Sequence, residues 1–166
     1  MGESLKILLI DADSMFRKIM EKYANEHKVH LDSFRSFDSI NEQSQLNSYQ
    51  LAVVEYDQEG ETGYDVAVKL NELCRDLPVL LVSATNRPWQ HGDLEINNIK
   101  ALASKWIGYD KVFDILVKGA KGDFDQASLT QMEEFSPGEE ERQKFHSWSE
   151  DGKITQIPHH HCYAAY

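Results

Sequence analysis

Polar residues follow four short apolar runs in the sequence, and their chemical types could act together. They comprise four acids, one hydroxyl and one amine: Asp11, Asp13, Glu55, Asp57, Ser83 and Lys118. Open α/β sheets bind ligands beyond the carboxyl ends of their strands, so residues that directly follow buried strands can meet at one edge. Carboxylates there would supply the oxygen ligands that hard divalent cations need. The spacing indicates one functional cluster, and the alternative is that polar residues end strands in any α/β domain.

The apolar runs themselves predict strands. Four runs are apolar at every position, as expected for strands buried on both faces of a parallel sheet: Ile7–Ile10, Leu51–Val54, Val79–Val82 and Ile115–Val117. Val29–Phe34 has apolar residues at every second position and predicts a weaker strand. Helical patterns are expected at five places: Met15–Tyr23, Asp38–Leu46, Val66–Cys74, Leu94–Trp106 and Asp123–Phe135.

This alternation predicts a fold class. Parallel neighbours need crossover helices, and right-handed crossovers place those helices on both faces of the sheet. We therefore expect a flavodoxin-like, doubly wound α/β fold whose five-stranded parallel sheet has the order 2-1-3-4-5.

The chain length predicts one domain with an extension. We expect a single domain over residues 1–135, since 166 residues leave little room for a second. Ser136-Pro137-Gly138 and the three glutamates after it predict a linker over residues 136–142. Residues 143–166 have the pattern of a β-hairpin with apolar contributors Phe145, Trp148, Ile154 and Ile157. An isolated hairpin is marginal, so it would pack on a surface, begin an output domain or exchange between chains in a homodimer.

Composition and local patterns narrow the partners, the location and the metal sites that we expect. The formal net charge of −11 repels nucleic-acid phosphates, so we expect no nucleic-acid partner. Apolar runs are short and the N-terminus lacks the features of a secretory signal, so we expect a cytoplasmic protein without membrane insertion. Cys74 and Cys162 are expected to be free thiols. An exposed tail is favoured over a metal site for His159–Cys162, because adjacent residues cannot all face one ion.

The order of these residues resembles the receiver family of response regulators over about residues 5 to 121. That family has acids after its first strand, a phosphate-accepting Asp after its third, Ser or Thr followed by Ala after its fourth, and Lys after its fifth. The matching residues are Ile10-Asp11-Ala12-Asp13, Val54-Glu55, Ser83-Ala84 and Lys118, with Gly60 and Gly63 in the loop that follows the phosphoacceptor position. The resemblance implies a signalling domain of a two-component phosphorelay.

Departures from the family pattern bear on function. Glu55 stands at the phosphoacceptor position, so phosphorylation there is not expected. Ala12 replaces a magnesium-binding carboxylate. Ile115 occupies the switch position where many receivers have Tyr or Phe. Gly119 stands where the family generally has a cis-forming proline, and Thr85–Asp93 looks like an insertion in a segment about a dozen residues too long.

We interpret the chain as an atypical receiver, a phosphorylation-independent signalling or adaptor module that acts by protein–protein binding without catalytic residues. Glu55 would satisfy Lys118 and Ser83 much as an acyl phosphate would, or the pocket would be vestigial. The alternative is a receiver that is phosphorylated, with Asp57 as the candidate acceptor, or that binds Mg²⁺ weakly through Asp11, Asp13 and Glu55. No other cofactor is expected.

Three tryptophans are candidates for a partner-binding face, namely Trp89, Trp106 and Trp148. For Trp106, whose spacing is helical, core packing is the preferred interpretation. The expected partner is a protein, such as a kinase, an output domain or a signalling complex, or a second copy of the chain.

Overall fold

A five-stranded, all-parallel sheet with the order β2-β1-β3-β4-β5 forms the centre of the molecule. In the computed structural model the described residues are 3–41, 43–84 and 98–124. The strands are β1 (Lys6–Ile10), β2 (His30–Phe34), β3 (Leu51–Glu55), β4 (Val79–Ser83) and β5 (Ile99–Ser104). The predicted flavodoxin-like fold and strand order are confirmed.

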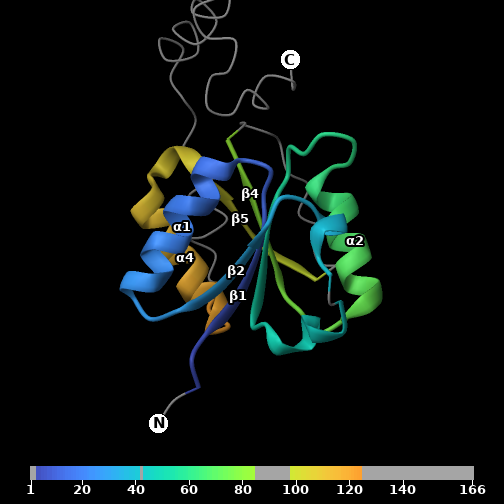
Figure 1. Cartoon of the computed structure of the whole chain (residues 1–166), viewed down its shortest axis with the longest axis horizontal. Coiled ribbons are helices and arrows are strands. Elements are labelled where there is room, and N and C mark those ends of the chain that lie inside the picture. The colour runs from blue at the N-terminus through green and yellow to red at the C-terminus, as the bar shows by residue number, and fades with distance from the viewer. Residues whose placement is uncertain (1–2, 42, 85–97, 125–166) are drawn as a thin grey trace, which may run out of the picture.

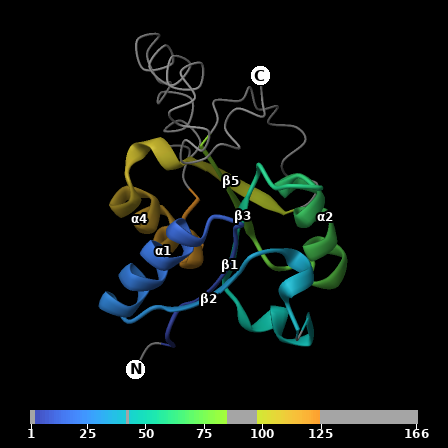
Figure 2. The ribbon, with the colours of Figure 1, turned by 45° about the horizontal axis from the view of Figure 1, so that its top comes forward.

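Helices cover both faces of the sheet (Figures 1 and 2). One face carries α1 (Ser14–Glu26) and α4 (Tyr109–Ala120), and the other carries α2 (Gly63–Leu73). Three short 3₁₀ helices complete the described part: η1 (Phe37–Ser39), η2 (Gln43–Ser48) and η4 (Lys105–Ile107). None of the helices in these ranges is long and apolar enough to cross a membrane.

The apolar runs form the sheet because both of its faces are covered. Every residue of β3 and β4 is buried, so both strands are apolar without alternation up to their last residues, Glu55 and Ser83, as expected for central parallel strands. β2 lies at an edge and is only partly buried, which explains its weaker pattern. The alternating residues of each central strand enter two separate hydrophobic clusters, one under α2 and one under α1 and α4.

The fifth strand was predicted wrongly. Ile115–Val117 lies inside α4, whereas the strand paired with β4 is Ile99–Ser104. In α4 the buried residues recur at helical spacing: Val112, Phe113, Ile115, Leu116, Gly119 and Ala120. A short apolar run cannot by itself distinguish one buried face of a helix from a buried strand. The expected helix over Leu94–Trp106 is wrong for the same reason from Ile99 onward.

Two other expected helices also differ. The segment predicted as one helix over Asp38–Leu46 instead contains η1 and the start of η2. The helix predicted over Asp123–Phe135 lies outside the described residues beyond position 124, as do the linker and the extension. Thr85–Asp93 is outside them too, although the reason for inferring an insertion there is gone, because β5 ends well before Lys118.

Candidate functional site

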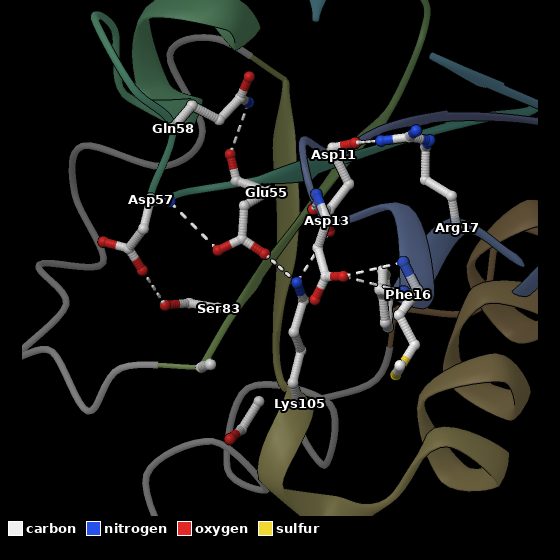
Figure 3. Close-up of polar contacts among 12 residues, drawn as sticks. Asp11, Asp13, Phe16, Arg17, Glu55, Asp57, Gln58, Ser83 and Lys105 are labelled. Carbon is white, nitrogen blue, oxygen red and sulfur yellow. Dashed lines mark hydrogen bonds and ion pairs between the residues drawn. The ribbon is translucent and has the colours of Figure 1, made fainter. Parts of the chain in front are cut away.

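The predicted cluster lies at the carboxyl edge of the sheet, but its lysine is Lys105. Asp11 directly follows β1, Glu55 ends β3 and Ser83 ends β4. Lys105 directly follows β5 and extends its side chain between the two acids (Figure 3). Because parallel strands end at the same edge, residues from four separate segments meet here.

Lys105 forms a buried ion pair with both acids. Its Nζ lies 2.8 Å from Asp11 Oδ2 and also contacts Glu55 Oε2. The side chain of Lys105 is 5% exposed, and those of Asp11 and Glu55 are 0% and 1% exposed. The centroid of the Phe16 ring, in α1, lies 4.2 Å from Lys105 Nζ, and the ring covers the ammonium group. When both carboxylates are ionised, the one ammonium group balances only one of them, and the cluster then carries one excess negative charge.

Burial and the excess charge shift the pKa values of the cluster in a definite direction. Burial raises the pKa of Glu55 well above its ordinary value; Lys105 opposes this rise, and the neighbouring Asp11 and Asp57 add to it. Burial would lower the pKa of Lys105, but Asp11 and Glu55 outweigh that effect and the pKa of Lys105 is raised. Lys105 therefore stays charged, and Glu55 holds its proton to a higher pH than a solvated glutamate.

Asp11 and Asp13 are held by the start of α1. Asp11 Oδ1 accepts a hydrogen bond from the backbone N–H of Asp13 at 2.8 Å. Asp13 caps α1, since its Oδ1 accepts from the N–H groups of Met15 and Phe16 at 3.0 and 3.2 Å. Arg17 Nη1 donates to the carbonyl of Asp11 at 2.6 Å. The acids after β1 are thus fixed by local structure.

The loop after β3 is closed against the strand that it leaves. Gly63 N donates to the carbonyl of Tyr56 at 2.7 Å, and a Cβ at Gly63 would lie 2.6 Å from Glu55 O, so only glycine fits. Thr62 caps α2 in a capping box with Asp65. The resemblance included Gly60 and Gly63. The close approach of Gly63 to the backbone of Glu55 explains why a glycine is needed at position 63.

Ser83 contacts Asp57 in this structure. Its Oγ donates to Asp57 Oδ2 at 2.7 Å, and the N–H of Asp57 donates to Glu55 Oε1 at 3.3 Å (Figure 3). Gln58 Nε2 donates to the carbonyl of Glu55 at 2.7 Å. The carboxylates of Glu55, at the end of β3, and Asp57, two residues later, therefore contact different side chains, Lys105 and Ser83.

Lys118 was assigned to the site wrongly, and so were the residues counted from it. Lys118 is on α4, more than half exposed, and pairs with Asp114 at 3.0 Å. Ile115 is buried in the core under α4, away from the switch position. The residue three positions before Lys105 is Leu102, also aliphatic and buried. Gly119 is likewise a helix residue, and a Cβ added there would lie 3.0 Å from the ring of Phe124 and 3.2 Å from the side chain of Leu51.

Trp106 directly follows Lys105 and stands where a proline was expected after the lysine. The described residues contain no cis peptide bond. The indole Nε1–H of Trp106 donates to the carbonyl of Ala84, so this side chain spans from β5 to the end of β4. Trp106 is half-buried, and Trp89 and Trp148 lie outside the described residues. The sequence signal for Lys105 was the polar pair Ser104-Lys105 after a short run rich in alanine.

The donor set does not fit a magnesium ion. Asp11 Oδ2 and Glu55 Oε2 contact the Lys105 ammonium, and Asp13 Oδ1 accepts two backbone bonds. Ala12 supplies no oxygen from its side chain. Across residues 3–41, 43–84 and 98–124 no three His, Cys, Asp or Glu side chains are grouped in a way that could hold a metal ion. A divalent cation would have to displace the Lys105 ammonium group, which is covalently part of the chain.

No family model matches the sequence. Solved structures do match. A CheY-like receiver domain protein from Methanospirillum hungatei JF-1 aligns with a TM-score of 0.59 at 10% identity, covering 73% of this chain and 97% of that chain. The chemotaxis protein CheY4 of Vibrio cholerae aligns with a TM-score of 0.60 at 9% identity over 70% and 98%. This chain has the fold of a response-regulator receiver domain.

An orphan response regulator of H. pylori is also similar, with a TM-score of 0.56 at 16% identity over 70% of this chain and 97% of that chain. At such low identities, the structural alignments establish a shared fold alone. The polar residues lie where the family pattern places them, at the carboxyl ends of the first, third, fourth and fifth strands. They are Asp11, Glu55, Ser83 and Lys105.

Proposed function

We propose that this chain is an atypical receiver, a signalling or adaptor module that binds protein partners and does not depend on phosphorylation. The observation that carries the proposal is the buried contact of Glu55 with Lys105. In the receiver family the corresponding positions hold the phosphate-accepting Asp and the lysine. Here the pocket supplies its own anion to the lysine, so the lysine needs no phosphoryl group to gain a partner.

The surroundings of Lys105 support a fixed state. Two of its sides face the carboxylates of Asp11 and Glu55, and a third faces the ring of Phe16. An incoming phosphoryl group would have to separate Lys105 from Asp11 and Glu55 and leave those carboxylates without their cation, and loss of one partner of a buried pair costs about 3–5 kcal/mol in general. A fixed domain is regulated by the concentration of its partner, because phosphorylation no longer shifts its conformational equilibrium.

The proposed partners are proteins: a kinase, an output domain, a larger signalling complex or a second copy of this chain. The formal charge of −11 disfavours nucleic acid, since phosphates would be repelled. We place the chain in the cytoplasm and assign it no enzymatic turnover, as part of the same proposal. Two readings of the pocket stay open within it, a mimic of the activated state and a vestigial pocket that merely neutralises charge.

Labelling with a phosphodonor tests the proposal. The protein is treated with acetyl phosphate, and separately with beryllofluoride, in the presence of magnesium. Mass spectrometry and the amide resonances of Glu55, Ser83 and Lys105 are then compared before and after treatment. We expect no adduct and no shift. A stoichiometric adduct on this chain would contradict the proposal and restore an ordinary phosphorelay switch.

A matched variant separates the two readings of the pocket. Glu55→Asp restores the carboxylate length of the family's phosphoacceptor. Labelling of this variant by acetyl phosphate would support a pocket that decayed from a working site. If the variant stays unlabelled and also loses affinity for the native partner, a mimic of the activated state is supported, because the longer side chain is then required.

One observation favours a second candidate, phosphorylation of Asp57. Asp57 is half-buried beside the pocket and accepts a hydrogen bond from Ser83 at 2.7 Å. A hydroxyl so placed could also donate to a phosphoryl oxygen on that carboxylate. Labelling of the native chain that Asp57→Asn abolishes, and that Glu55→Gln leaves in place, would establish this candidate instead.

A further inference from the structure

A closed circuit of contacts joins the carboxyl ends of β3, β4 and β5. It consists of side-chain and backbone contacts among six residues, here called the edge circuit: Glu55, Asp57, Ser83, Ala84, Lys105 and Trp106. Glu55 contacts Lys105, and Trp106 is the next residue in the chain. The indole N–H of Trp106 donates to the carbonyl of Ala84. Ser83 donates to Asp57, whose N–H donates back to Glu55.

The link through Trp106 is tightly constrained. Ser104 pairs with Ser83 in the register of β5 and β4, so the two strand ends are neighbours. The hydroxyl of Ser104 accepts from the N–H of Trp106 at 3.2 Å and begins the 3₁₀ turn η4. Lys105 and Trp106 share this turn and extend in different directions, one to Glu55 and the other to Ala84. A change in the position of Lys105 therefore moves Trp106 as well.

Burial couples the contacts of the edge circuit to one another. Glu55, Ser83 and Ala84 are at most 4% exposed, so water does not compete well for their bonds. Hydrogen bonds in a buried network polarise one another and break cooperatively, whereas bonds at a solvated surface change independently. The loss of one contact in the circuit therefore weakens the other contacts.

We propose that Trp106 is a positioning residue that transmits the state of the Glu55–Lys105 ion pair to the end of β4. The ion pair holds η4, and the Trp106 indole holds the carbonyl of Ala84. This keeps Ser83 on Asp57. The proposal rests on the proposed function and deepens it, because it names the route by which the Glu55–Lys105 pair holds the end of β4 in place. The competing account is that Trp106 only fills space.

The indole N–H resonance of Trp106 provides the test. The chain has three tryptophans, and the resonance is assigned by its loss in Trp106→Phe, a variant that keeps an aromatic ring but no donor. Glu55→Gln removes the charge from one contact of the circuit, Ser83→Ala removes the hydroxyl from another, and both leave Trp106 itself unchanged. We expect both to shift the Trp106 resonance. Tyr49→Phe is the matched control, since it removes a hydrogen bond to Asp32 outside the circuit.

Amide exchange gives a second, independent readout. In Trp106→Phe we expect exchange at the amides of Ser83 and Asp57 to rise about three- to tenfold, the effect of losing roughly one hydrogen bond. The amides of β1 and β2 should be unchanged. The role proposed for Trp106 would be overturned if its indole resonance stayed unchanged in both Glu55→Gln and Ser83→Ala. It would also be overturned if the resonance moved equally in Tyr49→Phe. A phosphoryl adduct on Asp57 would instead contradict the proposed function without contradicting the role of Trp106.

Discussion

Glu55 and Lys105 form an ion pair in the core of the site although fifty positions separate them in the chain. Neither residue is near the other until β3, β4 and β5 align in parallel register. The contact brings together the phosphoacceptor position of the resemblance and the lysine after the fifth strand. It also leaves Asp11 as a second carboxylate on the same ammonium group.

Removal of the Lys105 charge should destabilise the fold strongly. Lys105→Met keeps the length of the side chain but leaves Asp11 and Glu55 buried without a cation. We expect the free energy of unfolding to fall by about 3–5 kcal/mol, as measured by urea denaturation at neutral pH. Lys118→Met is the control, and the exposed pair with Asp114 should change stability by about half a kcal/mol or less. Equal effects of the two variants would contradict the placement of Lys105.

The stability of the protein should decrease with pH through Glu55. Its pKa is raised in the folded state, so the folded chain binds this proton more tightly than the unfolded chain does. The proton's contribution is fully present below the unfolded pKa of about 4.3 and is lost as pH rises through the folded pKa. Glu55→Gln cannot lose a proton and should flatten this decline.

The measurement is urea denaturation of both proteins from about pH 4.3 upward, the window that the raised pKa opens. Glu59→Gln is a suitable control because Glu59 is exposed in the loop after β3. The control should keep the slope of the native protein. A slope that is identical in all three proteins would show that Glu55 does not titrate abnormally.

Gly63→Ala should destabilise the protein although it adds a better helix former to α2. A Cβ at Gly63 would lie 2.6 Å from both Glu55 O and the Cα of Tyr56, so the loop or the strand must shift. We expect a loss of about 1–3 kcal/mol, the usual effect of overpacking. The control is Gly60→Ala, where a Cβ meets nothing within 4 Å but φ is +87°. That variant should lose stability through backbone strain alone, about 1 kcal/mol, without moving the Glu55 amide.

Magnesium should stabilise the Lys105→Met variant and not the native chain. In the native chain the ammonium of Lys105 already lies against Asp11 and Glu55. Without it the two buried carboxylates need a cation, and a ligand that binds only the folded state raises the melting temperature. Thermal unfolding with and without magnesium chloride measures this difference. An equal rise in native protein would mean that magnesium has a site independent of Lys105.

Much of the fold follows from local patterns in the sequence. The runs Leu51–Val54 and Val79–Val82 are apolar throughout because their strands are covered on both faces, so their type and place could be predicted. Asp11, Glu55 and Ser83 were found for the same reason, since each directly follows an apolar run of this kind. The capping box at Thr62 and the glycine at position 63 are also local features.

The tertiary structure alone decided which segment is the fifth strand. Ile99–Ser104 includes the exposed Lys100 and two alanines, and such a pattern fits a strand or a helix. Ile115–Val117 is more apolar yet belongs to α4, because its periodicity extends over the whole of Tyr109–Ala120. Pairing of β5 with β4 resolves this ambiguity, since it is an interaction between distant segments.

Lys105 and Trp106 became site residues only through that pairing, as did the separate partnership of Ser83 with Asp57. The sequence determined that acids and a hydroxyl would meet at one sheet edge, because that depends on the period of local burial. Which cation joins them depends on register between strands, and no local period encodes register.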